Sequence, residues 1–155
     1  MPKPEPKSTE MQFFLIVRQI RIIGIAIILT ISLIFFSGLV VSGSNINKAY
    51  STYNLVTLII CPVLCVCSFF LKNSMLKKVT LANLSKTYFN AIVLPFALCD
   101  LGGILCITTS LFINQNIPFA ITGYIVTLLY LLMNFPKIEE YSKFSDLSLP
   151  LEYLQ

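Results

Sequence analysis

The chain has 155 residues, of which 56% are hydrophobic and only 12% are charged, and its formal net charge is +4. A soluble domain usually carries about 25% charged residues, and the mean hydropathy of +0.82 is typical of a membrane protein. The absence of histidine excludes histidine-ligated haem, zinc or copper and serine–histidine hydrolase chemistry.

The N-terminal half predicts a tail and two membrane spans. Residues 1–10 are polar and proline-rich, which favours a disordered tail. The apolar run 22–42 is long enough to cross a hydrocarbon core of about 30 Å. A polar loop follows over 43–54, and residues 55–71 form a shorter second span that contains Pro62.

The C-terminal half predicts two further spans joined by a tight turn. Residues 72–87 form a lysine-rich loop, and residues 88–113 form the third span. The tetrapeptide 114–117 is so short that the fourth span, 118–135, must return antiparallel beside the third. We therefore expect an all-α integral membrane four-helix bundle built from two antiparallel transmembrane hairpins.

The C-terminal tail, residues 136–155, begins with a proline that stops the fourth helix. Apolar residues recur at intervals of three from Ile138 to Leu147, with charged residues between them. This spacing is compatible with a short amphipathic helix or with a partly ordered tail.

The distribution of cations predicts the topology. Ten of the eleven Lys and Arg residues fall in the two tails, the residues flanking the first span and the 72–87 loop, whereas Lys48 alone lies in the other loops. The positive-inside rule then places both termini and the middle loop in the cytoplasm of a multi-pass membrane protein. We expect the membrane to be the bacterial inner membrane. A cleaved signal peptide at the first span is disfavoured, because about 20 apolar residues exceed a typical h-region.

Asp100 is an acidic residue inside the third span. Helical spacing puts Ala97 and Gly103 on its face, so a neighbouring helix could approach closely and the carboxylate should face protein or a polar crevice. An ionised Asp at a helix centre costs about 2.5–3.5 kcal/mol on insertion scales. Lys86, fourteen residues away, is too distant to pair with it along the helix.

Hydroxyl groups are the expected partners of Asp100. The leading candidates are Thr30 and Thr127, and the other hydroxyls are those of Ser32, Thr57 and Thr108. Asp100 would then be an interhelical hydrogen-bonding group, a proton or ion site, or a contact to another subunit. A backbone carbonyl freed by Pro95 is a further partner.

Small residues mark expected helix contacts. They are Ala97, Gly102 and Gly103 in the third span and the Gly38-x-x-x-Ser42 pattern in the first. We expect these positions to pack against helices of this chain or of another subunit.

All five cysteines, Cys61, Cys65, Cys67, Cys99 and Cys106, fall inside spans. A copper(I) thiolate cluster is conceivable. Because no CxxC motif is present and cysteine packs well as a small apolar group, core packing is favoured. No cofactor, metal site or catalytic residue is predicted.

The stretch 95–106, PFALCDLGGILC, resembles the carboxylate-bearing helix of rotary-ATPase proteolipids (subunit c). The resemblance implies an ion-binding role for Asp100, although the companion glycine run of proteolipids is missing from the other spans. The hairpin pattern also resembles small bacterial four-helix membrane proteins.

Two functions follow as hypotheses. The first is a non-catalytic accessory or assembly subunit of a larger membrane complex, whose partners are the lipid bilayer and other membrane subunits or further copies of itself. The second is a small proton- or ion-translocating protein that uses Asp100. Neither hypothesis involves nucleic acid or an enzymatic activity.

Overall fold

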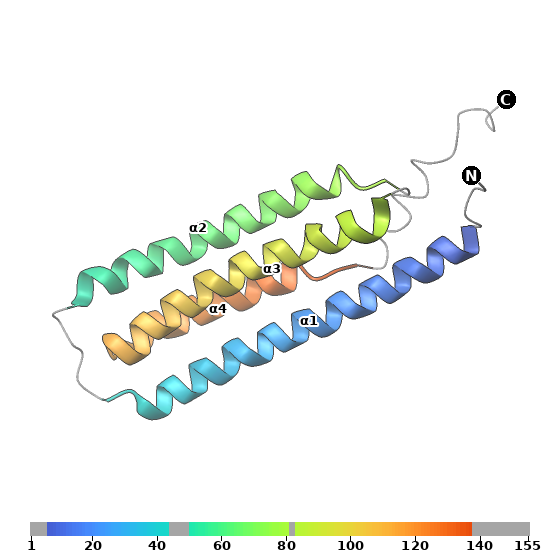
Figure 1. Ribbon diagram of the computed structural model, residues 1–155. Coiled ribbons are helices and arrows are strands. Elements are labelled where there is room, and N and C mark those ends of the chain that lie inside the picture. Colours follow the sequence, from blue (N-terminus) through green and yellow to red (C-terminus); the bar gives the residue numbers. More distant parts are fainter. Residues whose placement is uncertain (1–5, 44–49, 81–82, 138–155) are drawn as a thin grey trace.

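The computed structural model describes residues 6–43, 50–80 and 83–137, and within these ranges the chain is an all-α bundle of four long helices (Figure 1). The predicted amphipathic segment over 138–147 lies outside the described residues. Three helices are long and apolar enough to cross a membrane, so the chain is a multi-pass membrane protein by the length and composition of its helices.

The first helix, α1 (Pro6–Val41), is longer than predicted. Residues 6–10, expected in a disordered tail, belong to this helix, so that prediction is wrong for them. A proline fits the first helical turn because its missing N–H group needs no partner there, and most of the residues after it can continue a helix. The membrane-length apolar part of α1 is Met11–Val41.

The second and third helices also extend beyond their predicted spans. Helix α2 (Ser51–Leu76) and helix α3 (Leu84–Thr108) continue through Pro62 and Pro95. A single π-helical turn, η3 (Thr109–Ile113), follows α3. The spans were predicted too short because polarity marks where the hydrocarbon ends, and the helices do not stop there.

The fourth helix, α4 (Ile117–Met133), is apolar but has only 17 residues, about 26 Å at 1.5 Å per residue. It begins as predicted, with Pro118 in its first turn. The Asn116 side chain caps it by accepting a hydrogen bond from the N–H group of Phe119 at 3.4 Å. The turn before α4 contains Gln115, whose φ of 54° is left-handed.

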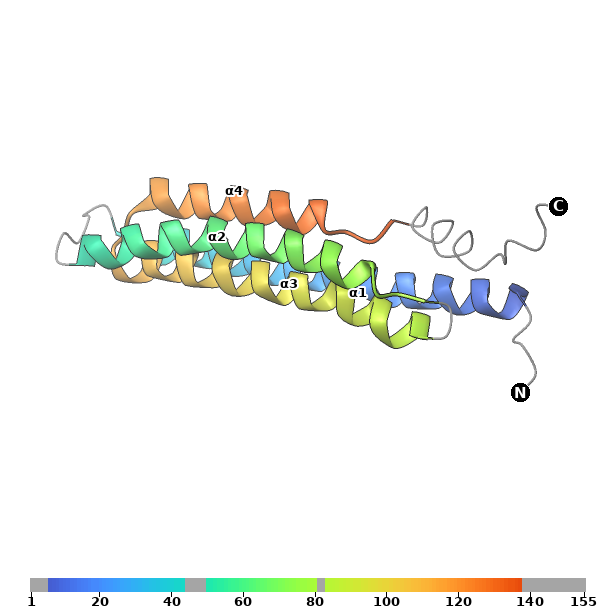
Figure 2. The same cartoon turned by 90° about the horizontal axis from the view of Figure 1, so that it is seen from above.

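Helices α3 and α4 lie between α1 and α2 (Figure 1). A view from above shows that the helices run along a common axis (Figure 2). Consecutive helices are antiparallel, as predicted, and α3 packs against α4 as a hairpin. Helices α1 and α2 make little direct contact, so the prediction of a first packed hairpin is wrong, and α2 packs mainly against α3 instead. Helix α3 touches every other helix and is the centre of the bundle.

The outward-facing side chains are largely apolar, as expected for contact with lipid. Leu33, Val40 and Phe70 are 69%, 86% and 66% exposed. On a soluble protein such a surface would aggregate, whereas hydrocarbon accepts it without cost. The lipid bilayer is therefore the natural environment of this surface.

Candidate functional site

Asp100 lies on the side of α3 that faces α1. Phe96 lies one turn before Asp100, and its ring packs against Gly24 of α1. A Cβ atom added to Gly24 would lie 2.9 Å from Cε2 of Phe96. Residues four apart share a helix face, so Asp100 continues the same face. The residue is half-buried, and its Oδ1 atom is fully buried with no hydrogen-bond partner among the described residues.

The two leading hydroxyl candidates are both bonded elsewhere. Thr30 is exposed and donates to the carbonyl of Ala26 at 2.9 Å within α1. Thr127 is buried, donates to the Gly123 carbonyl at 2.8 Å and lies 3.4 Å from the Cys61 sulfur. The predicted hydrogen bond between Asp100 and one of these threonines is therefore wrong for this fold, because helical hydroxyls bond the carbonyl one turn back.

The predicted small-residue contacts are used mainly inside the chain. Gly102 packs on the backbone of α2, where a Cβ would lie 3.3 Å from the Cys61 carbonyl oxygen, and Gly103 packs on Thr127 of α4. Gly38 packs on Leu111 of η3. These glycines let the helices of this chain approach one another, so they are not free for another subunit.

Ala97 and Ser42, the remaining small residues, behave differently. Ala97 is exposed, so of the two expected contacts it lacks the one with a helix of this chain, and contact with another subunit stays a prediction. The small side chain of Ala97 lies on the outer face of α3, one turn before Asp100. Ser42 is half-buried just after α1, and its N–H group donates to the Gly38 carbonyl at 2.8 Å.

Four of the five cysteines are core residues, as predicted from their size and polarity, and the prediction is wrong for Cys67. All five are free thiols, and only Cys67 is exposed. Among the described residues no group of three or more His, Cys, Asp or Glu side chains could hold a metal ion. The copper(I) alternative therefore has no support in this part of the chain.

A buried polar cluster occupies the core where α2, α3 and α4 meet, and the sequence did not single it out. The Ser68 hydroxyl lies 2.9 Å from the Cys99 sulfur and accepts a hydrogen bond from the Asn134 amide at 3.0 Å. Lys72, only 5% exposed, donates to the Asn134 carbonyl at 3.1 Å. Lys72 was expected in the loop after the second span, but it belongs to the last turns of α2.

Cations converge on the C-terminal end of α4. Besides Lys72, the Arg21 guanidinium from α1 donates to the Pro136 carbonyl at 3.4 Å. A helix C-terminus carries unpaired carbonyls and a partial negative charge, which cations stabilise. The short helix α4 is thus held at this end by a side chain from each outer helix.

The opposite end of the bundle carries a group of amides around the π-helical turn. The buried Ser110 hydroxyl donates to Oδ1 of Asn54 at 2.6 Å, joining η3 to α2. The amide of Asn114 donates to the Tyr50 carbonyl at 2.9 Å. The π-helical turn positions these residues, and such turns occur often at functional sites.

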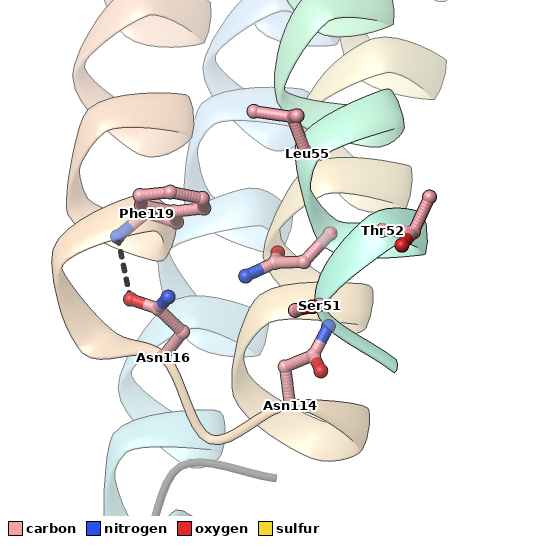
Figure 3. Close-up of a pocket in the computed structure, with 7 residues that line it drawn as sticks. Ser51, Thr52, Leu55, Asn114, Asn116 and Phe119 are labelled. Carbon is pink, nitrogen blue, oxygen red and sulfur yellow. Dashed lines mark hydrogen bonds between the residues drawn. The ribbon is translucent and has the colours of Figure 1, made fainter. Parts of the chain in front are cut away.

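A pocket of about 320 Å³ opens beside these amides, between the first turns of α2 and α4 (Figure 3). Its lining residues are Ser51, Thr52, Asn54, Leu55, Asn114, Asn116 and Phe119. Sequence reasoning treated residues 114–117 only as a tight turn. Three asparagines within or beside apolar helices were the signal that could have identified this pocket.

No protein-family model matches the chain, and no curated protein or solved structure is significantly similar to it.

Proposed function

We propose that this chain is a non-catalytic membrane subunit that associates, through the face of α3 around Asp100, with another membrane protein or with a second copy of itself. The observation that supports this proposal is the half-buried side chain of Asp100 inside a membrane-length helix, whose Oδ1 atom has no hydrogen-bond partner among the described residues. A carboxyl group without a hydrogen bond in an apolar environment costs free energy, and a donor from a second chain that reaches the exposed part of Asp100 would recover some of it.

The surface next to Asp100 is suited to a helix from a partner. Ala97 is exposed one turn before Asp100, and its small side chain would let a partner backbone approach closely. Leu94 and Leu101 are exposed at 48% and 51% on the same outer surface and would pack around the contact. A hydroxyl, amide or cationic side chain on the partner would then reach the carboxyl group.

The proposed orientation has both termini and the connection between α2 and α3 in the cytoplasm of a bacterial cell. The cation bias supports it, because Lys48 is the one Lys or Arg assigned to the opposite side. This orientation requires α4 to cross the membrane as well, and the length of this apolar helix, 17 residues, matches the shortest spans that bilayers accept.

The alternative function is proton or ion translocation, with Asp100 as the titratable group. The same unpartnered Oδ1 atom and the resemblance to proteolipids support it. Against it, the polar cluster of Ser68, Cys99 and Asn134 lies where α2, α3 and α4 meet, whereas Asp100 is on the side of α3 toward α1. Within the described ranges, no hydrogen bond from Oδ1 of Asp100 reaches that cluster.

Three variants of the full chain in native membranes test the proposal. Asp100→Leu removes the hydrogen-bonding group, Asp100→Asn keeps it without titration, and Ala97→Leu puts a bulky side chain where a partner helix would approach. Thr30→Val is the matched control, because it removes an exposed polar group that bonds only its own helix. Native gel migration and co-purification of two differently tagged copies report assembly.

We expect Asp100→Leu and Ala97→Leu to release a chain that migrates alone and Thr30→Val to assemble normally. The isolated Asp100→Leu chain should be at least as resistant to heat as the wild type, because an unpaired polar atom has been removed. A wild-type chain that migrates alone would refute the subunit proposal. Proton flux in liposomes that is lost in both Asp100 variants would establish the translocation function instead.

A further inference from the structure

We propose that the pocket between α2 and α4 binds the uncharged, hydroxyl-rich head group of a membrane lipid, about the size of one sugar ring. Its volume of about 320 Å³ is at the lower end of the range for small-molecule sites. This proposal is independent of the function assigned to Asp100, which lies on another face of α3.

The chemistry of the walls favours an uncharged ligand. Among the described residues that line the pocket, none is charged and three are amides that carry both donors and acceptors. A sugar hydroxyl can donate and accept at once, so it can satisfy either end of an amide. From the described part of the pocket wall, a phosphate or carboxylate would receive no cation and an ammonium group no carboxylate.

All three amides are held in place by hydrogen bonds, but only Asn116 is partly exposed, because Asn54 and Asn114 are each 1% exposed. Oδ1 of Asn116 accepts from the N–H group of Phe119, which leaves the amide donors of Asn116 for a ligand. Asn54 is fixed through its Oδ1 atom by Ser110, and Asn114 is fixed through its amide nitrogen. Groups held in this way lose little entropy on binding, which favours affinity.

The pocket changes from polar to apolar along the bundle axis. Asn114, Asn116 and Ser51 lie at the end of the bundle, whereas Leu55 and Phe119 lie one turn deeper and extend toward each other from α2 and α4 (Figure 3). A lipid changes from polar to apolar in the same direction, with a polar head group at the surface and apolar chains below. This match favours a lipid head group over a free sugar.

The neighbouring residues place the pocket at the level where head groups lie. Tyr50 and Tyr53, at the start of α2, are 46% and 66% exposed and line a second hollow together with Thr57, Thr109 and Ile113. Exposed tyrosines at a helix end are typical of the boundary between hydrocarbon and water. The Phe119 ring gives the pocket an apolar face on which the C–H face of a sugar can pack.

The test is native mass spectrometry of the purified full chain titrated with defined lipids. Monoglucosyl diacylglycerol and phosphatidylcholine with the same acyl chains are compared, and free glucose is a separate arm. The double variant Ser51→Ala with Asn116→Asp removes a hydroxyl and an amide donor, while the new carboxylate would still accept the capping bond from Phe119. Thr122→Val is the matched control, because Thr122 is exposed on α4, bonds the Pro118 carbonyl and does not line the pocket.

We expect the glycolipid to bind about tenfold more tightly than phosphatidylcholine and the double variant to lose about tenfold of that affinity, as for two lost hydrogen bonds. The control should bind like the wild type. If free glucose binds as tightly as the glycolipid and the double variant weakens its binding equally, the ligand is a soluble sugar and the lipid part of the proposal is wrong. Equal binding of the two lipids, or a double variant that binds like the wild type, would overturn the proposal.

Discussion

Lys72 donates a hydrogen bond from its buried Nζ atom to the backbone carbonyl of Asn134 at 3.1 Å, so a cation from α2 holds the C-terminal end of α4. We predict that Lys72→Met lowers the free energy of unfolding by about 1–3 kcal/mol, because a buried carbonyl loses a charged donor while the methionine stem still fills the space. Thermal unfolding of the purified chain in detergent measures this loss.

The control for that prediction is Lys77→Met, which removes an exposed lysine just beyond the same helix. It should leave the unfolding temperature unchanged. Equal effects of the two substitutions would mean that charge alone, and not the contact with α4, determines the result.

The bond between Ser110 and Asn54 predicts a measurable coupling between η3 and α2. Either Ser110→Ala or Asn54→Leu leaves one buried polar group without its partner, so each should destabilise the chain by about 1–3 kcal/mol. The double variant leaves neither group unpaired and should lose less than the sum of the single effects. A double-mutant cycle on unfolding free energies checks this, and strict additivity would show that the bond contributes nothing.

The close approach of α3 and α4 predicts a strong effect at Gly103. A Cβ there would lie 2.6 Å from Cγ2 of Thr127, so Gly103→Ala should separate the two helices and destabilise the bundle, although alanine is the better helix former. Thermal unfolding measures the loss. Gly43→Ala is the control, because its nearest neighbour is the flexible end of Gln115.

A second-site change makes the test of Gly103 specific. Thr127→Ala in the Gly103→Ala background removes the clashing methyl group, and the nearest remaining contact would be the Cβ atom at 3.1 Å. Part of the lost thermal stability should therefore return. If the double variant is less stable than Gly103→Ala alone, the loss does not come from this contact.

The apolar pattern was sufficient to predict the helices, their antiparallel order and the tight turn at Pro118. It could not predict where the helices end, because helical hydrogen bonding continues past the hydrocarbon boundary at Pro6 and at Lys72. It also could not predict the partners of Asp100. Gly102 packs on α2 and Gly103 packs on α4, and these contacts determine which side of α3 each helix occupies. Two adjacent glycines in a sequence do not indicate which helix will pack on which of them.

The burial of the cysteines predicts a pattern of thiol reactivity that depends on the fold as a whole. Four thiols lie in the core and Cys67 faces outward, so a membrane-permeant maleimide should modify one cysteine in the folded chain and all five after denaturation. Mass spectrometry of the intact chain counts the adducts. Cys67→Ser should abolish the labelling of the folded chain, whereas Cys65→Ser should leave one adduct, because the two residues lie on different sides of the same helix. Rapid modification of Cys61 or Cys99 without denaturant would contradict the packing of α2 against α3 on which the buried polar cluster depends.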